Sequence, residues 1–196
     1  MIDFASEVRR DPFEHTSAPA ILPSELCASA LDWLEHDAPW ELRVESFYEQ
    51  WELHINPNDL PIKLRALGSE STVERLTKKM ITPLCSGKIE LNEITAHKLV
   101  AGQTIKVHND FLIGGETYRL LIQLNRGWLD DQGGMLMLFS SSSSDDVRRV
   151  IRPLHRSAFA FGITPHSFHA VSTIYSGERY TIVYSFRGGA PTGRHD

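Results

Sequence analysis

The sequence predicts a mainly β protein whose helices lie near the N-terminus. From about residue 91 onward, short runs that alternate apolar and polar residues follow one another, separated by turns that contain glycine or polar residues. Before that point, apolar residues recur at helical spacing in two segments. Many short strands joined by frequent turns are typical of a sandwich or a barrel.

The two helical segments come first along the chain. Residues 24–35 place apolar side chains one helical turn apart, and Ser24 is the expected N-cap. Residues 72–82 also carry an apolar face. Pro83 should end this second helix, because proline has no backbone N–H to donate.

Strands are expected both before and after the second helix. Residues 40–45 alternate apolar and charged side chains, as a half-buried strand does, and 56–59 ("NPND") predict a turn. The serine-rich stretch 140–146 predicts a loop between two strands. The strands expected after residue 91 are 91–100, 103–108, 117–125, 134–139, 156–162, 167–173 and 179–186.

Three parts of the chain follow from these elements. Residues 1–90 should form a layer of helices and strand that supports the barrel, 91–187 the barrel itself, and 188–196 a C-terminal tail. With 196 residues, 41% of them hydrophobic and 23% charged, the composition is that of an ordinary soluble globular protein. Its size allows a buried core without disulfides.

Charge and cysteine content narrow the functional classes. The formal net charge of −5 argues against a nucleic-acid partner, because duplex binding usually needs a basic face. Cys27 and Cys85 are too few for a disulfide framework or a thiolate zinc site. The N-terminus has no apolar signal core, and no apolar run is long enough to cross a membrane. We therefore expect a cytoplasmic protein that binds no membrane.

The stretch "IKVHND" ends a predicted strand with two potential metal ligands. Period-two geometry puts His108 and Asp110 on the same side of the chain. A distant histidine, His166 or His169, lies on or near a later strand. Two histidines and one carboxylate in this arrangement form the facial triad that binds non-haem Fe(II) and leaves coordination positions open.

The strand after the distal histidine carries a second feature. Arg179 and Thr181 share one face of a strand that otherwise contains mostly apolar residues. An arginine there can bind a carboxylate through two parallel hydrogen bonds. Thr181 can donate a further one.

Three longer stretches carry a family resemblance. "GQTIKVHND", "RLLIQLNRGWLDDQGGMLMLF", and "RPLHRSAFAFGITPHSFHAV" followed by "GERYTIV" occur in this order within residues 91–187. Together they resemble the 2-oxoglutarate- and Fe(II)-dependent dioxygenase superfamily, in its prolyl-4-hydroxylase-like branch. The resemblance implies a double-stranded β-helix, which is a jelly-roll, cupin-like barrel.

The resemblance also implies which residues hold iron. His108, Asp110 and His169 correspond to the three ligands. His169 is preferred over His166 because an apolar Ala-Val pair follows it and because it precedes Arg179 by the usual separation. His166 is expected to be structural.

The cosubstrate site follows in the same way. The resemblance implies that Arg179 binds the far carboxylate of 2-oxoglutarate, with Thr181 assisting. Gln123 lies two residues before Asn125, where related hydroxylases carry a tyrosine that also touches this carboxylate, so Gln123 is a candidate contact. Leu99 likewise replaces a tyrosine found in many prolyl hydroxylases.

The candidate contacts to the prime substrate are Tyr118, Arg119 and Trp128. Arg119 shares a strand face with Leu121 and Gln123 and should point inward; an ion pair at the barrel mouth is the alternative. Trp128 has packing as its alternative role.

The implied activity is hydroxylation of an unactivated C–H bond of an amino acid or peptidyl residue, prolyl or similar. Fe(II), 2-oxoglutarate and O2 are the cofactors and cosubstrates, ascorbate is a candidate reductant, and succinate and CO2 are released. Because Asp110 is a carboxylate, hydroxylation rather than halogenation is expected. Oxidation of a small biosynthetic intermediate is an alternative, and a non-catalytic metal-binding cupin-like barrel is another. Arg179 and Thr181 argue against the barrel without activity, since a metal holder needs no buried arginine.

Overall fold

The computed structural model describes residues 7–191, which form two antiparallel β-sheets and a helical layer. The larger sheet has seven strands in the order β1-β9-β6-β11-β4-β3-β2, and the smaller has four in the order β5-β10-β7-β8. The strands are β1 (His15–Ala18), β2 (Glu41–Val44), β3 (Glu49–His54), β4 (Cys85–Val100), β5 (Ile105–His108), β6 (Tyr118–Gln123), β7 (Leu136–Phe139), β8 (Val147–Ile151), β9 (Ala158–Gly162), β10 (His169–Val171) and β11 (Glu178–Pro191).

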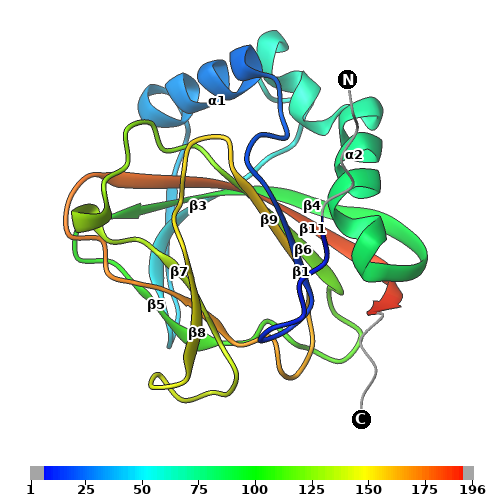
Figure 1. The fold of residues 1–196 in the computed structure, drawn as a ribbon. Helices are drawn as coiled ribbons and strands as arrows, with labels where there is room; N and C mark the ends of the chain where they lie inside the picture. The colour runs from blue at the N-terminus through cyan, green and yellow to red at the C-terminus, as the bar shows by residue number, and fades with distance from the viewer. Residues whose placement is uncertain (1–6, 192–196) are drawn as a thin grey trace.

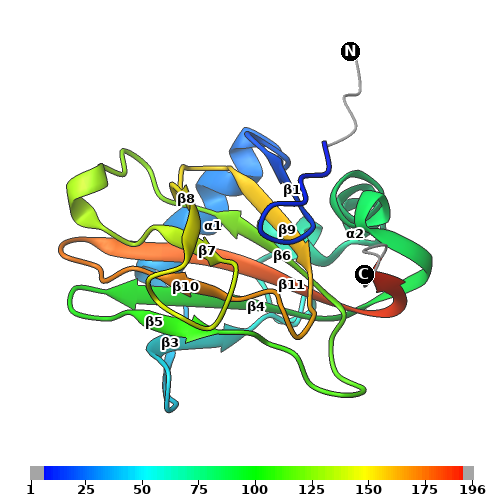
Figure 2. The same ribbon diagram turned by 60° about the horizontal axis from the view of Figure 1, so that its bottom comes forward.

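The helices gather on one side of the larger sheet. Figure 1 shows α1 and α2 on the face of this sheet that points away from β5, β7 and β8. In Figure 2, β7 and β8 come forward in front of the larger sheet. The helical elements are α1 (Ser24–His36), η1 (Ile62–Gly68), α2 (Glu70–Leu76), η2 (Thr77–Ile81), η3 (Thr82–Leu84) and η4 (Asp130–Gln132).

The main hydrophobic core fills the space between the helices and the outer face of the larger sheet. Leu31, Leu64 and Met80 pack there with Ile182 and Tyr184, all of them fully buried or nearly so. The Tyr184 hydroxyl donates to the main chain of η1 over 2.9 Å, so its polar end is satisfied. The opposite face of the sheet is therefore free to face the smaller sheet, and the jelly-roll fold predicted from the sequence is confirmed.

One side of the barrel is closed by the turn before β3. Tyr48 forms a β-bridge with Ile105, and the Lys106 N–H donates to the Phe47 carbonyl oxygen over 2.8 Å. The two sheets are thus joined at this side by backbone pairing. The first 90 residues contribute β1, β2 and β3 to the larger sheet, so they take part in the sheet itself as well as covering it.

The N-terminal helices differ from the prediction in detail. Helix α1 begins at Ser24, but Pro23 is its N-cap and no side chain caps it. The helix expected over 72–82 is α-helical only to Leu76, and it continues through a π-helical and a 3-10 turn. Pro83 lies at the start of that last turn, where a backbone N–H would have no partner within the turn.

The strands show a similar pattern of agreement and error. β2 is exposed along its whole length rather than half-buried, because it is the last strand of its sheet. β1, β3 and β8 were not predicted, because their residues do not alternate cleanly. β11 extends to Pro191, so part of the expected tail is strand, while 192–196 lie outside the described residues.

No helix within residues 7–191 has the length and apolar character required to span a membrane.

Candidate active site

A cavity of about 290 Å³ lies between the inner faces of the two sheets. Alternate residues of β4, β6 and β11 point into it from the larger sheet, because successive side chains of a strand face opposite sides. β5 and β10 contribute from the smaller sheet, and residues of β3 and the turn before it form the remaining wall. The candidate functional residues are distributed over these opposing walls.

Three potential metal ligands meet on the wall formed by the smaller sheet. His108 ends β5, His169 begins β10, and the two residues are direct partners in the antiparallel pairing of these strands. Asp110 follows two residues after His108. The ligand atoms of these three residues lie within 4.8 Å of one another, and Asp110 oxygens lie 3.6 Å from His108 Nε2 and 3.3 Å from His169 Nε2.

Both imidazoles are oriented by the backbone. Nδ1 of His108 lies 2.9 Å from the Lys106 carbonyl oxygen, and Nδ1 of His169 lies 2.9 Å from the Ser167 carbonyl oxygen. A carbonyl can only accept, so each Nδ1 carries the proton and each Nε2 keeps its lone pair. Both lone pairs point toward Asp110, which is the arrangement that a metal ion requires of histidine ligands.

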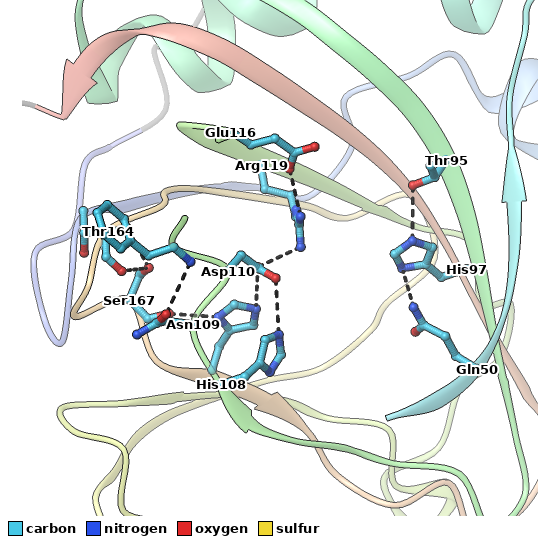
Figure 3. A network of polar contacts seen from close by, with 12 residues as sticks. Gln50, Thr95, His97, His108, Asn109, Asp110, Glu116, Arg119, Thr164 and Ser167 are labelled. Carbon is cyan, nitrogen blue, oxygen red and sulfur yellow. Dashed lines mark hydrogen bonds and ion pairs between the residues drawn. The ribbon is translucent and has the colours of Figure 1, made fainter. Parts of the chain in front are cut away.

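Arg119 and Glu116 extend the cluster onto the larger sheet (Figure 3). Arg119 Nη1 lies 2.7 Å from Asp110 Oδ2, and Nη2 lies 2.8 Å from a Glu116 oxygen. Burial opposes the charge of Asp110, but the Arg119 guanidinium outweighs it and holds the pKa of Asp110 well below its usual value. Asp110 is therefore a carboxylate at neutral pH.

Asn109 holds the turn between His108 and Asp110. Its Nδ2 donates to the Pro165 carbonyl oxygen over 2.9 Å, and its Oδ1 accepts from the Phe111 N–H at 3.3 Å. The bond to Pro165 ties the segment after β5 to the segment before β10. The two parts of the ligand cluster are thereby held together by a residue that sequence reasoning did not single out.

Arg179 lies at another part of the cavity, and no carboxylate within residues 7–191 forms an ion pair with it. Its side chain is buried, and Nε has no hydrogen-bond partner among the described residues. Burial alone lowers the pKa of Arg179 to about 10. A buried guanidinium is costly unless an anion or acceptor meets it, so this residue fits the role of binding a carboxylate.

Gly134 gives Arg179 its space. A Cβ at Gly134 would lie 3.0 Å from Arg179 Cδ and still closer to Ile174, and the residue has a φ of 66°, which favours glycine. The Gly-Gly pair in the sequence is thus explained in part by the packing of this arginine.

Thr181 lines the cavity beside Arg179, whereas Gln123 does not. Thr181 Oγ1 donates to Gln123 Oε1 over 3.0 Å, and Asn125 Nδ2 approaches the same oxygen at 3.4 Å. Gln123 is buried and its carbonyl oxygen is already used. The structure therefore gives Gln123 a contact to Thr181 in place of the direct carboxylate contact that the sequence suggested.

The three residues predicted to contact the substrate lie in different parts of the structure. Arg119 lines the cavity and also forms the ion pair that was its alternative. Tyr118 faces the other side of β6 and is fully buried in the main core, so its prediction is wrong. Trp128 packs against Leu99 and Val171 and donates to the Gly133 carbonyl oxygen at 2.9 Å, so it does not reach the cavity.

His97 is a cavity residue that sequence reasoning missed. It projects from β4 and lies 3.2 Å from Thr95 Oγ1 through Nε2, and 3.5 Å from Gln50 Nε2 through Nδ1 (Figure 3). Burial lowers the pKa of His97 to about 4, so it is neutral at physiological pH. Its spacing of two from Leu99 indicated a shared strand face, but nothing local indicated which face looked inward. His166 is exposed and does not join the ligand cluster.

Comparison with known proteins agrees with this geometry. Residues 94–187 match the family model of the 2OG-Fe(II) oxygenase superfamily. No curated protein sequence matches the chain.

Solved structures show the same fold at low sequence identity. A prolyl-4-hydroxylase from Pseudomonas putida aligns with a TM-score of 0.68 and 17% identity, over 88% of this chain and 91% of that one. A Trichoplax adhaerens prolyl hydroxylase, in complex with a peptide of hypoxia inducible factor, aligns with a TM-score of 0.67 and 15% identity, over 88% and 83%. A non-haem α-ketoglutarate-dependent epimerase of nogalamycin biosynthesis aligns with a TM-score of 0.62 and 12% identity, over 91% and 81%.

The family model and the ligand cluster support each other. Two imidazoles and a carboxylate are the donor set of non-haem Fe(II) oxygenases, and the unpartnered Arg179 suits a dicarboxylate cosubstrate. Residues 94–187 match the 2OG-Fe(II) oxygenase superfamily over nearly half of the chain, and with the ligand cluster they identify a 2-oxoglutarate-dependent dioxygenase that uses Fe(II) and O2.

Proposed function

We propose that this enzyme hydroxylates an unactivated C–H bond of an amino acid or peptidyl residue, prolyl-like in character. In the balanced reaction, one oxygen atom of O2 enters the substrate as hydroxyl and the other enters succinate, while 2-oxoglutarate loses CO2. The observation that carries the proposal is the ligand cluster facing the same small cavity as an arginine without a partner.

His108, Asp110 and His169 would hold Fe(II) and leave positions open for 2-oxoglutarate and O2. When bound, the metal with its cosubstrate supplies the oxidising power that a C–H bond requires. Asp110 takes the third protein position, so no protein position is left for a halide, and hydroxylation is the expected outcome.

The remaining residues position and shield the reactants. Arg179 would form two parallel hydrogen bonds with the far carboxylate of 2-oxoglutarate, and Thr181, whose hydroxyl donates to Gln123, would line the site beside it. Arg119 holds the Asp110 oxygen that it contacts at 2.7 Å, which fixes the orientation of the carboxylate. Leu121 and Phe161 line the cavity and limit the entry of water.

A small biosynthetic intermediate is the second candidate substrate. The cavity volume of about 290 Å³ favours a compact molecule or a single side chain over an extended segment. A metal-binding barrel without activity is disfavoured, because it has no use for the buried cation of Arg179.

The test is succinate release by the Fe(II) enzyme across amino acids, short peptides and small molecules. A hydroxylase should couple succinate formation to a product that gains one oxygen atom, as measured by mass spectrometry. Products that lack added oxygen, despite coupled succinate release, would contradict hydroxylation and leave the dioxygenase class intact.

A further inference from the structure

The charged residues that line the cavity do not balance. Three carboxylates (Glu52, Glu93 and Asp110) face two guanidinium groups (Arg119 and Arg179). Arg119 is already paired with Asp110 and with Glu116 behind it. Because Fe(II) is a divalent cation and 2-oxoglutarate a dianion, loading the site leaves this excess of negative charge unchanged.

Glu52 and Glu93 are therefore the cavity carboxylates that form no ion pair with a buried cation among the described residues. Glu52 has only the exposed Arg43, with a separation of 3.9 Å. Glu93 has an ion pair with the exposed His54, at 3.6 Å, and the buried Arg119 of the same row attracts it without forming an ion pair. Both exposed partners are weak, since exposed ion pairs contribute little and are screened by salt.

Gln50 shows that the wall beside Glu52 has an unused acceptor. Gln50 is 3% exposed and lines the cavity, and its Oε1 atom has no hydrogen-bond partner among the described residues. Its Nε2 donates to Glu52 Oε1 over 2.8 Å. This bond defines the orientation of the amide, because the opposite orientation would set a carbonyl oxygen against a carboxylate. A buried carbonyl oxygen without a donor costs free energy unless a ligand supplies one.

His97 cannot supply the missing positive charge. It is the direct cross-strand partner of Glu52 on β4, and Thr181 is its partner on β11. Its imidazole is neutral at physiological pH, for the reason given above. The row from β3 to β11 thus offers a carboxylate, a neutral imidazole and a hydroxyl, with no cation of its own.

Glu93 is a second carboxylate on this wall that would be stabilised by an added cation. It lies in the row of Ser185 and Arg119, and burial and the neighbouring Glu116 carboxyl both raise its pKa. Two carboxyl groups in contact are relieved by an added cation.

We propose that the prime substrate carries a protonated amine, which is bound by the Glu52 carboxylate and the Gln50 carbonyl oxygen, with Glu93 adding attraction from the neighbouring strand. This inference rests on the proposed function of the same cavity. It narrows the substrate to free amines and amino acids with an unblocked amine, and it disfavours residues inside a peptide whose nitrogen is an amide.

The experiment uses pairs of compounds that differ in one charge. L-Proline is paired with N-acetyl-L-proline, L-lysine with Nε-acetyl-L-lysine, and L-ornithine with L-citrulline. Each is added anaerobically to the enzyme loaded with Fe(II) and 2-oxoglutarate, and binding is read from the change in the metal-to-ligand absorption band. Succinate release under air is measured in parallel.

The proposal expects the member with the additional amine to bind tenfold or more tightly than its partner in at least one pair; the proline pair tests the α-amine, and the other two pairs test a side-chain amine. Glu52→Gln should weaken that binding by about ten- to a hundredfold, because a hydrogen bond to a charged group contributes about 1.5–3 kcal/mol. Glu41→Gln is the matched control: Glu41 pairs directly with Glu52 across β2 and β3 but does not line the cavity, so its loss should change binding less than threefold.

Three results would overturn the inference. These are equal or better binding of the member that lacks the amine in all three pairs, no response to any member that carries it, and a Glu52→Gln enzyme with unchanged preference. Formation of the absorption band in Glu52→Gln shows that the protein is folded and loaded. If the band never forms in the unmodified enzyme, the cosubstrate assignment fails as well, so the two failures are distinguishable.

Discussion

Two opposing walls of the cavity differ in what they lack. At the ligand cluster, Asp110 and two Nε2 atoms converge on a point with lone pairs and negative charge, which calls for a cation. At Arg179, a guanidinium is buried without a counter-charge, which calls for an anion. In the folded protein, the negative charge of the ligand cluster and the positive charge of Arg179 do not pair with each other.

The two regions also differ in how firmly their side chains are held before a ligand binds. The cluster is held by backbone carbonyls, by Asn109 and by Arg119, so its geometry exists before any ligand binds. Arg179 is held by packing against Gly134, and its polar atoms are left available. A metal needs exact placement of its ligands, whereas a carboxylate needs a charge and two donors in reach.

The largest effect is expected from removing a ligand. Asp110→Ala or His169→Ala should lower Fe(II) affinity by more than about a hundredfold, since loss of even an outer-shell partner costs ten- to a hundredfold. His166→Ala, at an exposed position outside the cluster, should keep its iron. Elemental analysis after gel filtration measures this. Iron loss in His166→Ala with retention in His169→Ala would reverse the choice of distal ligand.

Arg179→Ala should separate the two regions. Removing one member of a buried charge pair costs about 2–5 kcal/mol, which is roughly 30- to several-thousand-fold in 2-oxoglutarate affinity. Arg179→Lys should fall between, because it keeps the charge and loses the two-pronged contact. Anaerobic titration of 2-oxoglutarate into the Fe(II) enzyme gives the dissociation constant, and Fe(II) content should stay unchanged. An unaltered constant would remove the cosubstrate role and revive the inactive barrel.

Arg119→Gln should weaken metal binding by about ten- to a hundredfold, as other residues that orient a metal ligand do. The dissociation constant for Co(II), a spectroscopic substitute for Fe(II), provides a readout that does not depend on turnover. A loss of substrate binding with unaltered metal affinity would instead make Arg119 a substrate contact, as the sequence first suggested.

Tyr118→Phe is the neighbouring control and should have the smallest effect. The ring lies on the opposite face of β6 in the main core, so Kd values for metal and 2-oxoglutarate should change less than about twofold. A larger change would mean that the outer face of this strand influences the cavity, and the separation of the two faces would need revision.

The sequence predicted most of the barrel because its strands alternate and its turns are marked. It did not predict β3, whose residues Glu49–His54 read as polar and aromatic without a clear period. This strand is the one that brings Gln50 and Glu52 to the cavity. The pairing that places it beside β4 joins residues far apart in the chain, and no local pattern encodes that register.

The candidate site also contains some residues that the sequence could predict and others that it could not. His108 and Asp110 could be paired because two residues on one strand share a face, whatever the rest of the chain does. Tyr118 and Arg119 could not be assigned by the same rule alone, because alternation says that they differ and not which one faces inward. His97 and Asn109 act through contacts to other strands and turns, which become visible only once the sheets are paired.

The ion pair between Arg119 and Asp110 has a consequence for the enzyme when no iron is bound. If iron were the only counter-charge of this buried carboxylate, dissociation of the ion would leave the charge unpaired. The free energy of unfolding would then fall. Here the protein carries its own counter-charge for that carboxylate. The chain can therefore be made, stored and refilled with iron as a folded protein, and scarcity of the metal should lower its activity before it lowers its abundance.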